Sequence, residues 1–332
     1  MNLVTHVILT GGVGSRLWPL SRKSQPKQYL ELFNNTSLFE MALERNATIA
    51  NKVMVVGNID NYQLSQKILE KKETKYIDIV ESTPRNTAAA IAFAAFASNP
   101  DDILLVTPSD HVIEGSIAYK NAVLAAIEKA QQGFIVTFGI VPTKPETGYG
   151  YIEFKEDTVL SFREKPTEEV AQNFIEQGNF LWNSGMFCFK ASVMLDEIKR
   201  FTPEIYKRAK IAWELNKNGR LDLDLSLAIP SISIDYAVME RSAKIKVVAA
   251  TFQWSDLGSF EAVYDYLVAK KYPIDKNGNM VIGSDLYTAF IGVKNSIFVH
   301  TPTANLILQK EASQDVKELY NKLEKEDASL LN

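Results

Sequence analysis

A glycine-rich turn near the start of the chain, and two cations in and after it, combine residue types that bind phosphates. The apolar run Val4–Thr10 leads into Gly-Gly-Val-Gly-Ser-Arg, and Pro-Lys-Gln follows at 26–28. Glycines let backbone N–H groups approach a polyphosphate closely, because no side chain stands between them. The cations would neutralise its charge. We therefore predict a nucleoside triphosphate site at Gly11, Gly12, Gly14, Ser15, Arg16 and Lys27.

Two well-known glycine motifs do not fit this turn. A dinucleotide fingerprint read from Gly12 requires a glycine at position 17, which is Leu17. A P-loop requires Gly-Lys-Ser/Thr at a fixed spacing, which the turn lacks. These differences argue against a nicotinamide-dependent dehydrogenase. The alternative for the turn is a tight connection between a strand and a helix, with two surface charges.

Two carboxylates follow predicted strands. Pro108, Ser109 and Asp110 follow the apolar strand Ile103–Thr107. Ligands of open parallel sheets gather at the carboxyl ends of strands, so we predict that Ser109 and Asp110 bind the nucleotide. Asp110 could therefore hold Mg²⁺, which prefers one or two carboxylates together with phosphate oxygens. Asp256 would supply a second carboxylate. The alternatives are a helix N-cap for Asp110 and a turn residue for Asp256.

Other polar residues lie at the ends of predicted elements. Glu164 and Lys165 end a strand next to a proline, and the alternative for them is a solvated charge pair. Gly150 offers backbone against which a sugar ring could lie, and Asn183 offers a donor and an acceptor to a hydroxyl. Both could also be turn residues.

Asn86 and Thr87 precede an alanine-rich helix that is apolar nearly all round. We expect them near the base or ribose of a nucleotide. The alternative is that they cap this helix.

The pattern of apolar residues predicts an α/β protein. Strand and helix patterns alternate in the first half, which favours a mostly parallel, mixed sheet covered by helices. Strands are expected at 4–10, 52–57, 76–81, 103–107, 134–140, 149–154, 159–163, 180–190 and 244–250. Helices are expected at 61–72, 87–98, 118–132, 168–177, 193–201, 204–217 and 259–270. We predict a main domain at 1–271 and a short β-rich tail at 272–332 that ends in a helix.

The composition excludes several classes of protein. The chain of 332 residues has a formal net charge of −4 and no dense basic stripe, so we expect no nucleic-acid partner. A single cysteine, Cys188, rules out an internal disulfide. No apolar run reaches the ~18 residues of a membrane span, and the N-terminus lacks the basic flank of a signal peptide. We expect a cytoplasmic protein without a membrane partner.

The motifs, taken in order, resemble those of the sugar-nucleotide pyrophosphorylases. The segment GGVGSRLWPLSR with PKQ is similar to the mannose-1-phosphate guanylyltransferase branch of that family. Further matches run densely through residues 1–270 and loosely beyond. They are PRNT, PSDH, TGYGYI, FREKP, WNSGMF, SIDYAVME and WSDLGS.

The resemblance implies a fold and a set of roles. It implies a Rossmann-like nucleotidyltransferase domain with a short β-helix-like tail. It pairs Asp110 and Asp256 as Mg²⁺ ligands and makes Arg16, Lys27 and Lys165 catalytic, with Lys165 on the sugar phosphate. It also implies that Glu164 binds sugar hydroxyls. At position 163 this chain has arginine where relatives often carry valine or a similar residue. This difference leaves the implied roles of Glu164 and Lys165 unchanged.

The resemblance further implies that GTP and mannose 1-phosphate give GDP-mannose and diphosphate. One alternative is the same reaction with another nucleotide and sugar phosphate, which would form GDP-heptose, UDP-glucose or dTDP-glucose. Another alternative is a catalytically silent sugar-nucleotide sensor. We expect a monofunctional protein, because the tail is too short for the isomerase domain of many bacterial relatives. A homodimer formed through the tail is a further hypothesis.

Overall fold

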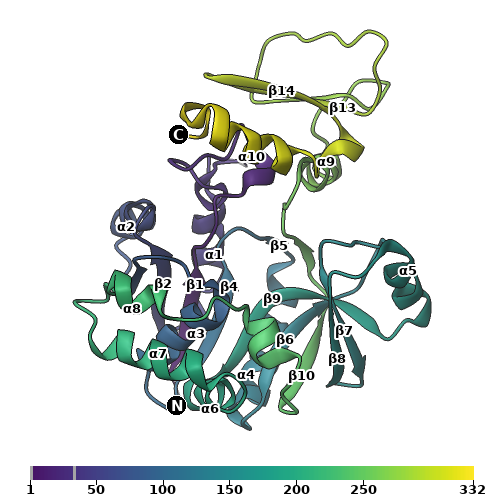
Figure 1. Ribbon diagram of the computed structural model, residues 1–332. Coiled ribbons are helices and arrows are strands. Elements are labelled where there is room, and N and C mark those ends of the chain that lie inside the picture. The colour runs from purple at the N-terminus through teal and green to yellow at the C-terminus, as the bar shows by residue number, and fades with distance from the viewer. Residues whose placement is uncertain (1–2, 33–34) are drawn as a thin grey trace. The chain divides into compact units, whose positions relative to one another are not determined.

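The computed structural model describes residues 3–32 and 35–332, which form two compact units. The sheet unit comprises residues 3–11, 42–109 and 113–254 of this part, and the loop unit comprises 12–32, 35–41, 110–112 and 255–332 (Figure 1). The loop unit thus combines the glycine-rich turn with the C-terminal part of the chain. This division rests on packing, and the predicted division of the sequence at 271/272 stays a prediction.

The sheet unit is built on a nine-stranded mixed sheet in the order β3-β2-β1-β4-β9-β6-β10-β8-β7. The neighbours β3-β2-β1-β4 are parallel, as are β6 and β10, whereas β7, β8 and β9 pair antiparallel with their neighbours. The predicted α/β fold with a mixed sheet is confirmed. The strands are β1 (Val4–Leu9), β2 (Lys52–Asn58), β3 (Tyr76–Glu81), β4 (Ile103–Pro108), β6 (Ile135–Ile140), β7 (Gly150–Lys155), β8 (Thr158–Glu164), β9 (Phe180–Lys190) and β10 (Ile245–Ala250).

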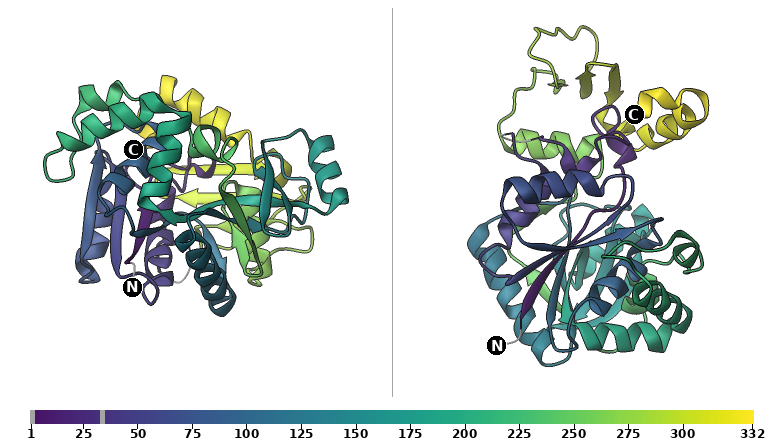
Figure 2. Two further views of the ribbon diagram at one scale, coloured as in Figure 1. Left: turned by 90° about the horizontal axis from the view of Figure 1, so that it is seen from below. Right: turned by 90° about the vertical axis from the view of Figure 1, so that its left-hand side faces the viewer.

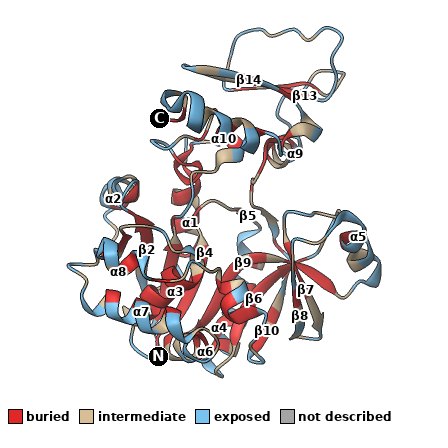
Figure 3. Cartoon of the chain, viewed as in Figure 1, coloured by how far each residue is buried: buried red, intermediate tan, exposed pale blue. Residues whose placement is uncertain are grey.

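Helices cover both faces of this sheet (Figure 2). On one face α3 (Asn86–Phe96) packs with α6 (Ala191–Phe201) and α7 (Pro203–Glu214), and α4 (Ser116–Gln131) covers the other. Successive residues of β4 alternate between the two cores: Leu104 and Val106 belong to the first and Ile103 and Leu105 to the second. Strands buried on both faces need continuous apolar runs, which is why their positions could be predicted. Figure 3 shows this buried centre in red.

The loop unit has its own apolar core. Leu17 and Trp18 pack with α9 (Phe260–Ala269), α10 (Val316–Glu326) and a three-stranded sheet. In that sheet β12 (Met280–Ile282) and β13 (Ser296–Thr301) are parallel, and β13 and β14 (Ala304–Gln309) are antiparallel. The predicted β-rich region with a final helix is therefore present. The short helices η1 (Ser15–Leu17), η2 (Lys27–Tyr29), η4 (Lys310–Ala312) and η5 (Ala328–Leu331) also lie in this unit.

The remaining elements connect or flank these cores. A capping box begins α1 (Leu38–Arg45), because the Ser37 backbone N–H and hydroxyl both donate to Glu40 and the Glu40 N–H donates to Ser37. The others are α2 (Tyr62–Lys71), α5 (Glu168–Gln177), α8 (Leu223–Leu227), η3 (Asp235–Met239) and the paired short strands β5 (Val112–Glu114) and β11 (Gln253–Ser255). Within 3–32 and 35–332, no helix is long and apolar enough to cross a membrane.

Candidate active site

The side chain of Lys27 is the centre of the predicted phosphate site in the loop unit. It is only 4% exposed, which is unusual for a lysine. The Lys27 N–H donates to the Val13 carbonyl over 3.0 Å, and this bond fixes its backbone to the glycine-rich turn. Gly14, at φ 78°, lies against its stem: a Cβ added there would be 2.5 Å from Lys27 Cβ. Glycine is therefore required at position 14 for both its backbone angle and its size.

The Lys27 ammonium joins the two predicted carboxylate residues. Its Nζ donates to Asp110 Oδ2 over 2.8 Å and also to the backbone carbonyl of Asp256. The Asp256 carboxylate in turn accepts the Gly258 N–H over 3.0 Å. The structure thus places Lys27, Asp110 and Asp256 in contact, and their role as one binding site stays a prediction.

The charge of Asp110 is maintained by its neighbours. Burial acts to raise the pKa of Asp110, but the charges of Lys27 and His111 and the hydrogen bond from Lys27 outweigh it and lower the pKa. His111 Nε2 lies 3.6 Å from Asp110 Oδ1. The carboxylate is therefore ionised at neutral pH.

The donor chemistry of this group fits a magnesium ion. Mg²⁺ binds through one or two carboxylates plus substrate phosphates. The Lys27 ammonium contacts the Asp110 carboxylate and the Asp256 backbone carbonyl, and both residues carry hard oxygen donors. Among the described residues, no group of three or more His, Cys, Asp or Glu side chains could hold a metal by itself. The remaining ligands would have to come from the phosphates of a bound nucleotide.

The turn itself leaves its backbone open to a ligand. A Cβ added to Gly11 or Gly12 would meet nothing within 4 Å. Gly14 lies at the N-terminal end of η1, which contains Ser15 and the exposed Arg16. Backbone N–H groups at such a left-handed turn suit an anion, and Arg16 is accessible to one.

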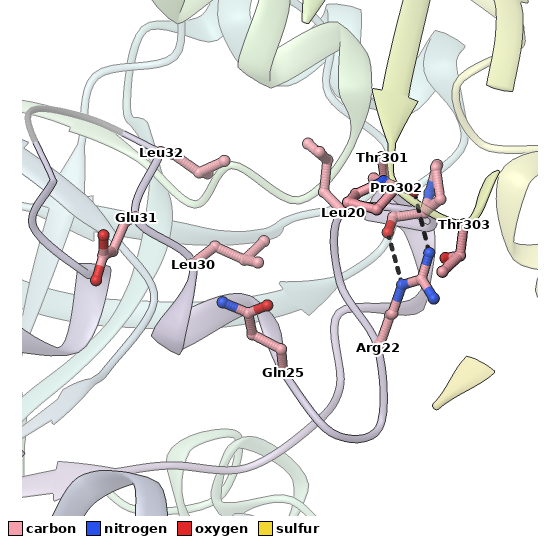
Figure 4. A pocket seen from close by; sticks show the side chains of 10 residues that line it. Leu20, Arg22, Gln25, Leu30, Glu31, Leu32, Thr301, Pro302 and Thr303 are labelled. Carbon is pink, nitrogen blue, oxygen red and sulfur yellow. Dashed lines mark hydrogen bonds between the residues drawn. The ribbon is translucent and has the colours of Figure 1, made fainter. Parts of the chain in front are cut away.

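Arg22, in the Trp-Pro-Leu-Ser-Arg motif, has a structural role. Its guanidinium donates to the Pro19 carbonyl over 3.2 Å and to Thr301 Oγ1 over 3.1 Å, which fastens the loop to the end of β13 (Figure 4). These groups line a cavity of about 370 Å³ in the loop unit. The conformation of the loop that carries Lys27 thus depends on a contact with a strand far along the chain.

In the sheet unit, several residues lie where parallel strands end. Gly11 follows β1 and Ser109 follows β4, and the Ser109 N–H donates to the Leu9 carbonyl over 3.1 Å. The Ser109 hydroxyl is buried and has no partner among the described residues. Asn86 and Thr87 begin α3 after β3. These predicted residues therefore lie at the edge of the sheet where ligands of open α/β folds bind.

The side chains of Asn86 and Thr87 both make hydrogen bonds to backbone N–H groups, one local and one long-range. Asn86 is exposed at φ 68°, and its Oδ1 accepts the Thr87 N–H over 2.8 Å. Thr87 Oγ1 accepts the Ile234 N–H over 2.8 Å. Neither residue is the N-cap of α3, which is Arg85 without a side-chain cap bond, and contact of Asn86 and Thr87 with a nucleotide stays a prediction.

Glu81, the last residue of β3, was not singled out from the sequence. It is 7% exposed, and its Oε1 has no partner among the described residues. Burial raises its pKa to about 7, against the opposing effect of a hydrogen bond from the Arg85 backbone. A carboxylate at the end of a predicted strand, three residues before Pro84, was the available signal, but its burial could not be read from the sequence.

The predicted sugar-phosphate residues lie together in the sheet unit. Gly150 pairs with Glu164 across β7 and β8, and a Cβ at Gly150 would be 2.5 Å from Glu164 Oε2 and 3.6 Å from Asn183 Cβ. Lys165 is exposed, lies at φ 46°, and places its Nζ 3.8 Å from Glu164 Oε1. The structure thus brings Gly150, Glu164, Lys165 and Asn183 together, and their binding of a sugar phosphate stays a prediction.

Asp235 joins this group, although no role was predicted for it from the sequence. Asn183 Nδ2 donates to Asp235 Oδ1 over 2.9 Å. Burial, and then the charge of Asp235, raises the pKa of Glu164, while Lys165 opposes the increase. Glu164, Tyr236 and Glu240 also line a cavity of about 350 Å³. The SIDYAVME motif was the signal, but a contact between residues 183 and 235 is too long-range to infer from one sequence.

The chain is similar to known proteins of one family. The family model described as "Nucleotidyl transferase" matches residues 5–271. Mannose-1-phosphate guanylyltransferase RfbM of Salmonella typhimurium is 38% identical, over 97% of this chain and 72% of that protein. The xanthan biosynthesis protein XanB of Xanthomonas campestris is 39% identical, over 97% and 74% respectively.

A solved structure gives the same result for the fold. The protein from Thermus thermophilus, named mannose-1-phosphate geranyltransferase, has a TM-score of 0.83 and 28% identity. The match covers 97% of this chain and 99% of that one.

Proposed function

Because the chain belongs to the nucleotidyl transferase family, we propose that it transfers a guanylyl group from GTP to mannose 1-phosphate, forming GDP-mannose and diphosphate. The observation that carries this proposal is the buried Lys27, whose ammonium contacts Asp110 and Asp256 beside an open glycine turn. That arrangement suits a triphosphate with a metal ion. The proposed sugar phosphate, mannose 1-phosphate, follows from the name of the relative RfbM. The proposed use of the product in polysaccharide synthesis follows from the name of the relative XanB.

The chemistry follows from the charges. An oxygen of the sugar phosphate attacks the α-phosphorus of GTP in line with the departing diphosphate, so two polyanions must approach each other. Backbone N–H groups of the turn hold the triphosphate, Arg16 binds the departing diphosphate, and Lys27 neutralises charge near the reacting phosphate. A family metal, which we propose to be Mg²⁺ on Asp110 and Asp256, would supply Lewis-acid stabilisation of the α-phosphate oxygens.

The sheet unit supplies the second substrate site. Lys165 orients the attacking phosphate, and Glu164 and Asn183 bind sugar hydroxyls against the Gly150 backbone. Such positioning accounts for much of catalysis in phosphoryl transfer, because no covalent intermediate with the enzyme is needed.

Glu81 offers a physical basis for guanine selection. Guanine presents two adjacent donors, N1–H and the N2 amino group, and an ionised carboxylate can accept from both. Glu81 has a buried oxygen without a partner among the described residues, near the predicted nucleotide residues Asn86 and Thr87. We propose that this carboxylate accepts the guanine donors.

A substrate panel tests the function. The protein would be supplied with Mg²⁺, each of four NTPs, and mannose, glucose or fucose 1-phosphate, and diphosphate release would be measured. We expect GTP with mannose 1-phosphate to give the highest kcat/KM. A higher value for another pair would reassign the substrates, and no release with any pair would contradict an enzymatic role.

A further inference from the structure

The carboxamide of Asn183 has a defined orientation. Its Oδ1 accepts the Gly185 N–H over 3.1 Å and lies 3.2 Å from Thr137 Oγ1. Since two donors face the oxygen, the nitrogen must point the other way. There Nδ2 donates one hydrogen to Asp235 Oδ1, and its second hydrogen has no partner among the described residues.

An irregularity in β9 places Asn183 in this position. Gly139 pairs with Asn183 and Thr137 pairs with Phe187, so the register of β6 against β9 shifts between these pairs. Gly185, within the shift, has φ 70°. Such bulges redirect side chains at the ends of sheets. The irregularity follows Asn183 directly, and the Gly185 N–H within it donates to the Asn183 side-chain oxygen.

The segment that carries Asp235 is itself fixed. Asp235–Met239 forms a π-helical turn, closed by the Glu240 N–H donating to the Asp235 carbonyl over 2.9 Å. Just before it, the Ile234 N–H donates to Thr87 Oγ1 over 2.8 Å, at the start of α3. π-turns are rare and occur often at functional sites. Asp235 therefore approaches Asn183 from a backbone anchored on another element.

We propose that Asp235 is a positioning residue of the sugar-phosphate site: it holds the Asn183 amide so that the second Nδ2–H is presented to a hydroxyl of the sugar. This inference rests on the proposed function for the identity of the substrate. The contact itself does not depend on that function. Asp235 needs no contact with the reacting atoms, and its effect is expected in the binding of one substrate alone.

Steady-state kinetics test the proposal through a pair of variants. Asp235→Ala removes the acceptor, and we expect the KM for mannose 1-phosphate to rise about tenfold, with the KM for GTP within about twofold. Asp235→Asn keeps an oxygen acceptor and should restore the KM to within about threefold of wild type. Equal increases in both KM values, or no difference between the two variants, would overturn the proposal.

Asp222→Ala is the matched control. Asp222 lies in the same unit and accepts one 3.0 Å bond from the Leu225 N–H as the cap of α8. Its loss should lower the melting temperature without raising the KM for mannose 1-phosphate. If Asp222→Ala raised that KM as much as Asp235→Ala, the effect would be general loosening of the unit and the proposal would be wrong.

A measurement without turnover separates this inference from the proposed function. In protein labelled with ¹⁵N-asparagine, the Asn183 side-chain amide would be assigned by its loss in Asn183→Ala. We expect its hydrogen-bonded proton to move upfield in Asp235→Ala and much less in Asp235→Asn. Unchanged Asn183 signals would overturn the proposal even in an active enzyme. The expected shift in a protein that makes no GDP-mannose would support the Asp235 contact while contradicting the proposed function.

Discussion

The residues predicted to bind phosphates in the loop unit and the residues predicted to bind the sugar phosphate in the sheet unit are arranged in different ways. In the first, one buried cation, Lys27, contacts the carboxylate of Asp110 and the backbone carbonyl of Asp256, which come from two distant segments of the chain. In the second, Asn183 of β9 and Asp235 of the π-turn share one hydrogen bond, and Glu164 at the end of β8 lies near enough for the charge of Asp235 to raise its pKa. A site for phosphates needs fixed charge, whereas a site for a sugar needs directed donors and acceptors.

The comparison predicts its largest effect at Lys27. Lys27→Ala leaves Asp110 without its ammonium partner and removes charge neutralisation at the phosphates. We expect kcat/KM to fall about a thousandfold, the upper range for loss of one such electrostatic group. Lys23→Ala is the control, because Lys23 is an exposed lysine of the same loop and pairs with Glu324 at the surface. Steady-state kinetics that show similar losses for both variants would break the assignment.

The stability of the protein should depend on pH through the ionisation of Glu81. The folded protein raises the pKa of Glu81 to about 7, so the folded state binds more protons than the unfolded state between about pH 4.5 and 7. Its contribution to stability is complete below this window and is lost as the pH rises through it. A shift of this size corresponds to about 3 kcal/mol.

Denaturant unfolding at pH 5 and pH 8 checks this. The loss of stability across the window should be smaller by about that amount in Glu81→Gln than in wild type. If ionised Glu81 accepts guanine donors, GTP affinity should rise over the same window in wild type and stay flat in Glu81→Gln. An identical pH dependence of stability in both proteins would contradict the buried-carboxyl account.

A smaller effect is expected at Gly14, where it sharpens the account of the loop. An alanine there would combine a left-handed backbone angle with a clash against the Lys27 stem, which predicts a loss of about 1–3 kcal/mol in the free energy of unfolding. Gly12→Ala is the matched control, because Gly12 has a similar φ of 84° but open space around it. Thermal unfolding should show the larger loss for Gly14→Ala, and equal losses would mean that contact with Lys27 adds nothing.

The same contrast explains what the sequence could predict. Local sequence patterns predicted the glycine turn around Gly14, the cation Lys27 and the apolar strands. Such features are specified by residues that are neighbours in the sequence. The capping box of Ser37 and Glu40 is equally local, since its two residues are three positions apart in the chain. The bond from Asn183 to Asp235 depends on a strand irregularity and a π-turn, and the burial of Glu81 depends on the whole fold. Neither leaves a periodic or compositional signal.

The central claim is that the protein joins the α-phosphate of GTP to the phosphate of mannose 1-phosphate and releases diphosphate. ³¹P NMR of the reaction tests this claim most directly. GTP and mannose 1-phosphate would be mixed in equal amounts with Mg²⁺ and the protein, with each substrate alone as a control. The account predicts GDP-mannose and diphosphate in equal amounts, and only when both substrates are present. Diphosphate from GTP alone, or consumption of GTP without GDP-mannose, would contradict it.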